Sequence, residues 1–248
     1  MARPREVAER DHDIQNPTSP EKIQLLGSYL RLTSDSRVLD IACGRCGPAI
    51  VLADTYGCQI VGVEKREAFA ADARRRIAAK GLEALIEVQV SDAADLVLEP
   101  EAWDAALCIG AAFVWGTISD AGAALAPTVR RGGFVAVGEP YWRTWPLPTA
   151  VGQETFAVGQ EDFVSLDATV ARFEQRGSLA TTGIIAASDD DWDQYKSLQW
   201  RAMEEWLSEH HDDPDVADIR AEHERLRSDY FEFKRALLGW AIFIGRKT

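Results

Sequence analysis

The chain has 248 residues, 46% hydrophobic and 27% charged, which is enough to build a full hydrophobic core. Its 40 acidic and 27 basic side chains give a formal charge of -13, which repels a nucleic-acid backbone and argues against nucleic acid as a partner. No apolar run approaches the roughly 20 residues of a membrane span, and the N-terminus lacks the apolar core of a signal peptide. We therefore expect a cytoplasmic protein without a membrane partner; the sequence does not indicate its oligomeric state.

The four cysteines are too few for a disulfide framework and fit a reducing compartment. Cys43 and Cys46 form a C-x-x-C pair, but no second pair or suitably spaced histidines accompany them. We expect the two thiols to line a turn and predict no metal site, with a metal or redox role as the alternative.

The first part of the chain predicts alternating helices and strands. Thr18 gives a capping signal ahead of Pro20, and Ile23, Leu26 and Leu30 follow at helical spacing. The next elements expected are a strand over 37–42, a helix over 48–56, a strand over 58–64, a helix over 68–80 ended by Gly81, and strands over 84–90, 103–110 and 132–140. Continuous apolar strands separated by helices are typical of a parallel sheet covered on both faces.

The pattern changes after residue 140. Prolines and aromatic residues over 141–149 predict a loop. A helix over 167–176, a strand over 179–187, helices over 190–208 and 214–238, and a strand over 239–247 follow, with Asp213 as the expected N-cap of the last helix. The two long helices could cover the ligand end of the sheet. We expect one domain, with an N-terminal arm and helix over 1–36, a core over 37–139, and a substrate loop, cap helices and last strands over 140–248.

The loop after the first strand does not have the G-x-G-x-x-G spacing of a dinucleotide-binding turn, which argues against a nicotinamide-dependent dehydrogenase. It begins with Asp40, and a carboxylate there suits a ligand with ammonium or hydroxyl donors, although Asp40 could instead cap the next helix. Glu64 ends the second strand, where it can accept hydrogen bonds from both hydroxyls of a ribose. Asp92 follows the third strand and can accept from an adenine amino group. Together they indicate a nucleoside carrying an amino acid.

At residues 40–47 the sequence DIACGRCG resembles the D-x-G-x-G-x-G motif of class I S-adenosylmethionine-dependent methyltransferases, with Ala42 and Cys46 in place of the first and third glycines. WDAALCIG and VRRGGFVAVGEP match the family's fourth and fifth strands. HDIQNPTSPEKIQLLG, GEPYWR and GWAIFIGRK further resemble a bacterial subgroup of small-molecule methyltransferases related to the ubiquinone-type enzymes. The resemblance implies an α/β fold with a Rossmann-like, seven-stranded, mostly parallel sheet, an antiparallel last strand, a helical cap, and S-adenosyl-L-methionine as the cofactor.

The resemblance also implies the cofactor contacts. They are expected to be Asp40, Ala42, Cys43, Gly44, Glu64, Lys65, Asp92, Ala93 and Cys108. Glu139, at the end of the fifth strand, is expected to orient the acceptor or take its proton, and His12 to assist if the arm folds over the site. Expected acceptor contacts are Gly110, Phe113, Tyr141, Trp142, Trp192, Tyr195 and Trp200. Each has a structural alternative: Glu139 bonded to backbone, the aromatic residues in the core, and His12 on a loose arm.

We expect methyl transfer to a small molecule by in-line displacement, with the nucleophile (N, O, S or C) left open. Two alternatives remain open from the sequence. One is a methyltransferase acting on protein or nucleic acid. The other is a methyltransferase-like fold that binds the cofactor for other chemistry or for sensing.

Overall fold

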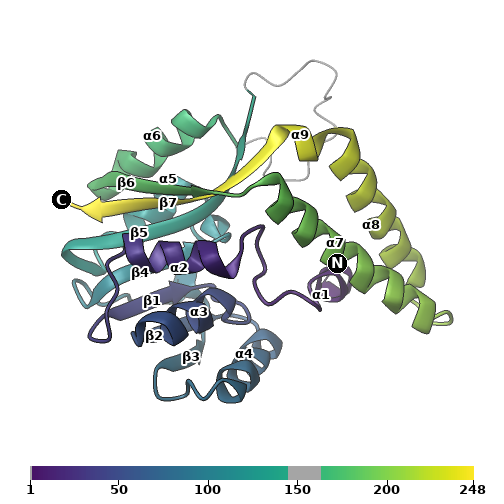
Figure 1. Ribbon diagram of the computed structural model, residues 1–248, viewed down its shortest axis with the longest axis horizontal. Coiled ribbons are helices and arrows are strands. Elements are labelled where there is room, and N and C mark those ends of the chain that lie inside the picture. The colour runs from purple at the N-terminus through teal and green to yellow at the C-terminus, as the bar shows by residue number, and fades with distance from the viewer. Residues whose placement is uncertain (1, 145–162) are drawn as a thin grey trace.

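The computed structural model describes residues 2–144 and 163–248 of the chain (Figure 1). Its strands form one sheet in the order β3-β2-β1-β4-β5-β7-β6. The strands are β1 (Arg37–Ile41), β2 (Gln59–Glu64), β3 (Ile86–Val90), β4 (Trp103–Ile109), β5 (Val129–Trp142), β6 (Leu179–Ala186) and β7 (Leu238–Lys247). β7 is antiparallel to both of its neighbours, and the other strands run parallel to one another. The predicted sheet is confirmed.

Helices cover both faces of this sheet. They are α1 (Ala2–Ala8), α2 (Pro20–Tyr29), α3 (Gly47–Tyr56), α4 (Glu67–Ala79), α5 (Ile118–Leu125), α6 (Leu166–Gly177), α7 (Asp189–Glu209), α8 (Val216–Asp229) and α9 (Arg235–Leu237). One apolar cluster joins the sheet to α2, α3 and α4, and a second joins its other face to α5 and α6. α7 and α8 lie beyond one end of the strands, with α1 beside them (Figure 1). In the two described ranges, no helix combines the length and apolar character needed to cross a membrane.

Side-chain caps explain where several helices begin. Ser19, not the predicted Thr18, caps α2: its hydroxyl accepts from the Lys22 N–H at 3.3 Å, and Pro20 fits the first helical position. A capping box at Thr117 begins α5, a short helix that the sequence analysis did not name. Gly81 ends α4 with a φ of +67°, as predicted from its tolerance of the left-handed conformation.

Two predicted boundaries are wrong for identifiable reasons. Tyr141 and Trp142 were placed in a loop but belong to β5, because antiparallel β7 supplies them with partners beyond the parallel strands. Residues 145–149 of that predicted loop lie outside the described part. The helix expected over 214–238 begins only at Val216 and is interrupted by a π-helical turn at Tyr230–Lys234. Asp213 does not cap it; its carboxylate accepts from the Asp215 N–H in the preceding turn.

The N-terminal segment is an ordered part of the fold, not a loose arm. Val7 and Ala8 of α1 pack in a small apolar cluster with Met203 and Trp206 of α7 and Ile219 of α8. The next segment, residues 9–19, connects α1 to α2 and is called the N-terminal strap below. It passes the carboxyl ends of the central strands, where the parallel-sheet rule places a ligand site.

Candidate active site

The loop between β1 and α3 has an alternating left-handed backbone. Ala42, Gly44 and Cys46 have φ values of +54°, +56° and +59°. Glycine adopts this conformation without cost, whereas a residue with a Cβ loses about 1–2 kcal/mol there. A hydrogen bond from the Cys46 N–H to the Cys43 carbonyl, at 2.8 Å, closes the turn. The two residues that replace motif glycines therefore keep the glycine conformation.

Three carboxylates approach this loop, and two of them are held by hydrogen bonds. Glu64 accepts from the Gly44 N–H at 3.0 Å and from the Arg66 N–H at 2.8 Å, which fixes the loop against β2. Asp92 pairs with Lys65 at 2.5 Å, and its other oxygen accepts from the Ala94 N–H at 3.1 Å.

Asp40 differs from these two acids because one of its oxygens has no partner. The residue is 2% exposed, and its Oδ2 atom is buried without a hydrogen bond. Burial, reinforced by the charge of Glu64, raises the pKa of Asp40 to about 7. A buried, unpaired carboxyl oxygen costs free energy until a donor reaches it, so this position fits a cationic or hydrogen-bond-donating ligand.

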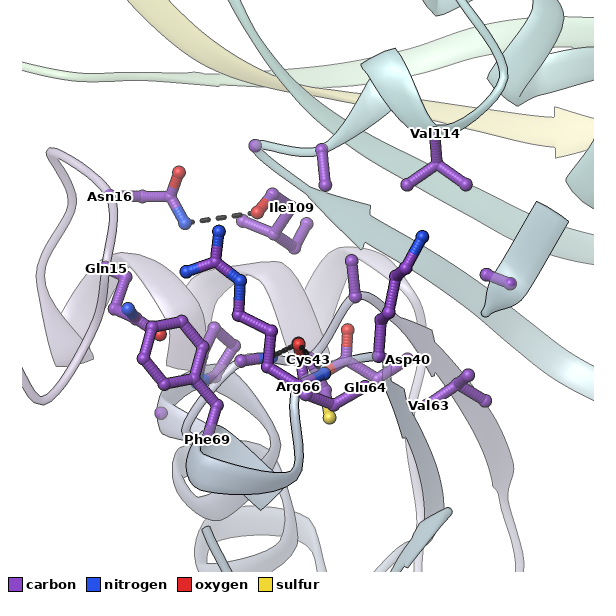
Figure 2. Close-up of a pocket in the computed structure, with 18 of the residues that line it drawn as sticks. Gln15, Asn16, Asp40, Cys43, Val63, Glu64, Arg66, Phe69, Ile109 and Val114 are labelled. Carbon is purple, nitrogen blue, oxygen red and sulfur yellow. Dashed lines mark hydrogen bonds between the residues drawn. The ribbon is translucent and has the colours of Figure 1, made fainter. Parts of the chain in front are cut away.

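A cavity of about 580 Å³ opens at this place (Figure 2). Its wall includes eight of the nine residues predicted to contact the cofactor: Asp40, Ala42, Cys43, Gly44, Glu64, Lys65, Asp92 and Ala93. Cys108 is not in the wall. It is fully buried in β4, where burial and the charge of Asp40 raise the pKa of its thiol.

The part of the wall that comes from the N-terminus was not predicted from the sequence. Asp13, Gln15 and Asn16 of the strap line the cavity, as does Arg5 of α1. Gln15 accepts from the Arg45 N–H at 3.2 Å, and Asn16 Nδ2 donates to the Ile109 carbonyl at 3.1 Å (Figure 2). The one available signal was a pair of adjacent amides in a short polar segment ahead of the first helix of the core.

A second cavity of about 300 Å³ adjoins the first, and Gly110 and Phe113 line both. Glu139 lies in its wall, half-buried, and its carboxylate has no hydrogen-bond or ion-pair partner among the described residues. Burial raises the pKa of Glu139 to about 7. Of the residues predicted to contact the acceptor or act on it, the structure brings Gly110, Phe113 and Glu139 together here.

The other predicted acceptor contacts line neither cavity in the described part of the chain: Tyr141, Trp142, Trp192, Tyr195 and Trp200. Tyr141 and Trp142 are buried in β5, and Trp142 packs near Phe163 with ring centroids 6.2 Å apart. Trp192 and Trp200 of α7 pack against Tyr230, which lies in the π-helical turn after α8. Tyr195 packs against Trp192.

His12 also lies away from both cavities. It is 1% exposed, with Nε2 2.9 Å from the carbonyl oxygen of Tyr195 and Nδ1 3.5 Å from a Glu9 carboxylate oxygen. Its ring packs edge-on against Tyr195 at 4.7 Å. His12 was expected to assist only if the arm folds over the site. The strap does reach the larger cavity, but through Gln15 and Asn16 and not through His12.

The Cys43–Cys46 pair lies in the turn itself, and both side chains are buried. The hydrogen bond between the two thiols, together with burial, raises the pKa of Cys43. Within residues 2–144 and 163–248, no group of three or more histidine, cysteine or acidic side chains has an arrangement that could hold a metal ion.

Comparison with known proteins agrees with this geometry. Residues 38–133 match the methyltransferase domain family. The protein YjhP of Escherichia coli (strain K12) is 31% identical over 237 residues, which cover 96% of this chain and 95% of YjhP.

A SAM-dependent methyltransferase from Thiobacillus denitrificans, solved with S-adenosyl-L-homocysteine, is 30% identical with a TM-score of 0.89 over 98% of this chain and 97% of its own. One from Geobacter sulfurreducens, also with S-adenosyl-L-homocysteine, is 29% identical with a TM-score of 0.91 over 100% and 99%. The similarity extends over nearly the whole of each chain, and the chain belongs to the class I S-adenosylmethionine-dependent methyltransferases.

Proposed function

We propose that this enzyme methylates a compact small molecule, with the methyl donor in the 580 Å³ cavity and the acceptor in the 300 Å³ cavity. The observation that carries the proposal is the contact between the two cavities at Gly110 and Phe113. A group held in one cavity can reach a group held in the other there, next to the uncommitted carboxyl of Glu139.

The larger cavity holds three carboxylates that can accept hydrogen bonds from S-adenosylmethionine. Asp40 offers its unpaired oxygen to the ammonium end, and Glu64 keeps lone pairs free for ribose hydroxyls beyond the two it uses on the backbone. Asp92 would accept from the adenine amino group. The Thiobacillus and Geobacter relatives were both solved with S-adenosyl-L-homocysteine, which supports the same use of this cavity.

S-adenosylmethionine supplies a methyl group already activated by its positive sulfur, so the protein mainly has to align the acceptor and exclude water. Phe113, Pro140 and Phe163 provide apolar walls for the acceptor, while Glu139 and Thr117 provide polar groups. A volume of 300 Å³ is at the lower end for small-molecule sites and favours a compact acceptor. Where the nucleophile is a hydroxyl or a protonated amine, Glu139 takes its proton; a pKa near neutrality suits that transfer.

The test uses methyl-labelled S-adenosylmethionine with a panel of compact oxygen, nitrogen, sulfur and carbon nucleophiles, followed by mass spectrometry. With the acceptor found, Glu139→Gln should lower turnover by roughly tenfold or more and leave donor affinity nearly unchanged. Glu83→Gln makes the same chemical change on the exposed surface and should keep the parent rate. Parent turnover in Glu139→Gln, or labelling of proteins and nucleic acid in preference to the panel, would contradict the proposal.

A further inference from the structure

The N-terminal strap touches the floor of the donor cavity at three glycines. A Cβ atom on Gly44 would lie 2.4 Å from Gln15 Oε1, and one on Gly110 would lie 2.0 Å from Asn16 Oδ1. A Cβ on Gly47 would lie 2.1 Å from the Asp13 carbonyl oxygen. A side chain at Gly47 would meet strap backbone, and one at Gly44 or Gly110 would displace the Gln15 or Asn16 amide, so strap and floor are closely packed.

Asn16 is fixed in a defined orientation within this wall. Its Nδ2 donates to the Ile109 carbonyl oxygen, which determines which end of the amide is the oxygen. In Figure 2 the nitrogen lies toward Ile109 and the oxygen points away from that bond. No described residue donates a hydrogen bond to Asn16 Oδ1. The oxygen lies over Gly110, one of the two residues shared by the cavities.

The strap is held by contacts in the part of it that precedes Asn16. Arg45 Nη1 donates to the carbonyl oxygens of Glu9 and Arg10, at 2.7 and 2.8 Å. Arg76 pairs with Asp13 at 2.7 Å. Asn16 therefore does not belong to a free terminus, and its amide is positioned before a ligand arrives.

With the methyl donor in the larger cavity, Asn16 Oδ1 would lie near the donor's sulfur, the atom whose charge changes in the reaction. The donor's sulfur carries a positive charge before transfer and none afterwards, and a carbonyl oxygen bears a partial negative charge that favours the first state. We infer that Asn16 determines donor specificity: Oδ1 contacts the sulfonium end and makes the site prefer S-adenosylmethionine to S-adenosylhomocysteine, while Nδ2 holds the amide on Ile109. This inference rests on the proposed use of the larger cavity for the donor.

The first test compares the dissociation constants of the two compounds by calorimetry. Asn16→Ala should lower the preference for S-adenosylmethionine over S-adenosylhomocysteine by roughly fivefold, mainly through weaker binding of the cation. Gln15→Ala is the matched comparison: it removes the neighbouring amide, which lies over Gly44 and not over Gly110, so both compounds should weaken by the same factor. An unchanged preference in Asn16→Ala would overturn the inference.

The second test leaves the protein unaltered. Asn16 is the single asparagine of the chain, so labelling with ¹⁵N-asparagine gives one side-chain ¹⁵N signal in an NMR spectrum. That signal should shift to different positions in the complexes with S-adenosylmethionine and with S-adenosylhomocysteine. Identical positions in both complexes would also overturn the inference. A parent protein that binds neither compound would instead overturn the assignment of the cavity, so the two failures are distinguishable.

Discussion

The hydroxyl of Tyr195 donates to Glu9 Oε1 at 2.7 Å and so joins residues 186 positions apart in the chain. Gln199 Nε2 donates to the same oxygen at 2.8 Å, and Glu9 is 3% exposed. A buried carboxylate at the start of the strap is thus held by two side chains of α7. Tyr195, expected to contact the acceptor, instead holds the segment that completes the donor cavity.

Tyr195→Phe should therefore weaken both the fold and the donor site. It removes one hydrogen bond from a buried charged group, an expected loss of about 1–3 kcal/mol in the free energy of unfolding. The affinity for S-adenosylhomocysteine should fall as well, because the strap is less firmly fixed. Urea unfolding and calorimetry measure the two effects. Tyr29→Phe, at an exposed site, is the control and should change neither; equal behaviour of the two variants would contradict the anchoring role.

Donor affinity should depend on pH through Asp40. In the free protein the pKa of Asp40 is raised to about 7, and a cationic ligand favours the ionised carboxylate. Affinity for S-adenosylmethionine should therefore rise between about pH 6 and pH 8 as the carboxyl loses its proton. Asp40→Asn should bind more weakly and lack this part of the pH dependence. Calorimetry at several pH values should be done with both proteins, because the ligand's own ionisation affects both equally and the difference between them reports Asp40. Affinities that change with pH in the same way in both proteins would contradict the role of Asp40.

Glu139→Gln should stabilise the ligand-free protein at alkaline pH. Burial raises the pKa of Glu139 from 4.5 to about 7, so between these values the unfolded chain releases the proton while the folded chain keeps it. The stability contribution of Glu139 therefore falls as pH rises through this window. The variant should exceed the parent in urea midpoint above about pH 7, and the difference should disappear near pH 4.5. A stability difference of the same size near pH 4.5 and above pH 7 would show that burial does not perturb the pKa of Glu139. The control Glu83→Gln should match the parent at both pH values.

At position 46 a glycine substitution should leave the protein more stable than an alanine substitution, although alanine is usually the less destabilising of the two. Both changes remove the buried sulfur, but alanine keeps the cost of a φ of +59°, and glycine does not. Cys46→Gly should be more stable than Cys46→Ala by about 1 kcal/mol in thermal or urea unfolding. Cys58, also fully buried but outside the left-handed region, provides the control, where Cys58→Ala should be the more stable. The same order at both positions would rule out backbone strain in the turn.

The sheet and the acidic residues of the donor cavity were predictable because both depend on local patterns. Each strand from β1 to β4 is a short apolar run bounded by turn residues, and the parallel arrangement places their ends together. Asp40, Glu64 and Asp92 follow from position alone: each stands at or just beyond the end of its strand.

The strap was not predictable in this way. Residues 9–19 show no hydrophobic period, and the bonds of Asn16 to Ile109 and of Glu9 to Tyr195 join segments far apart in sequence. The aromatic face of α7 shows a related limit. Trp192, expected to contact the acceptor, packs instead against Tyr195 and Tyr230, because helical spacing shows which residues share a face but not what that face meets. Trp142 was misplaced because its strand partner comes from β7, late in the chain.

Because β7 lies between β5 and β6, the sheet cannot be completed until the last strand has been synthesised. β6 is synthesised before α7 and α8, yet its partner strand follows both of them. Until residues 238–247 are made, one edge of β5 and both edges of β6 are unpaired, and unpaired edges can pair with other chains. A translation product that ends before β7 therefore exposes two strand edges that the complete sheet covers, and we expect it to aggregate more readily than the full chain.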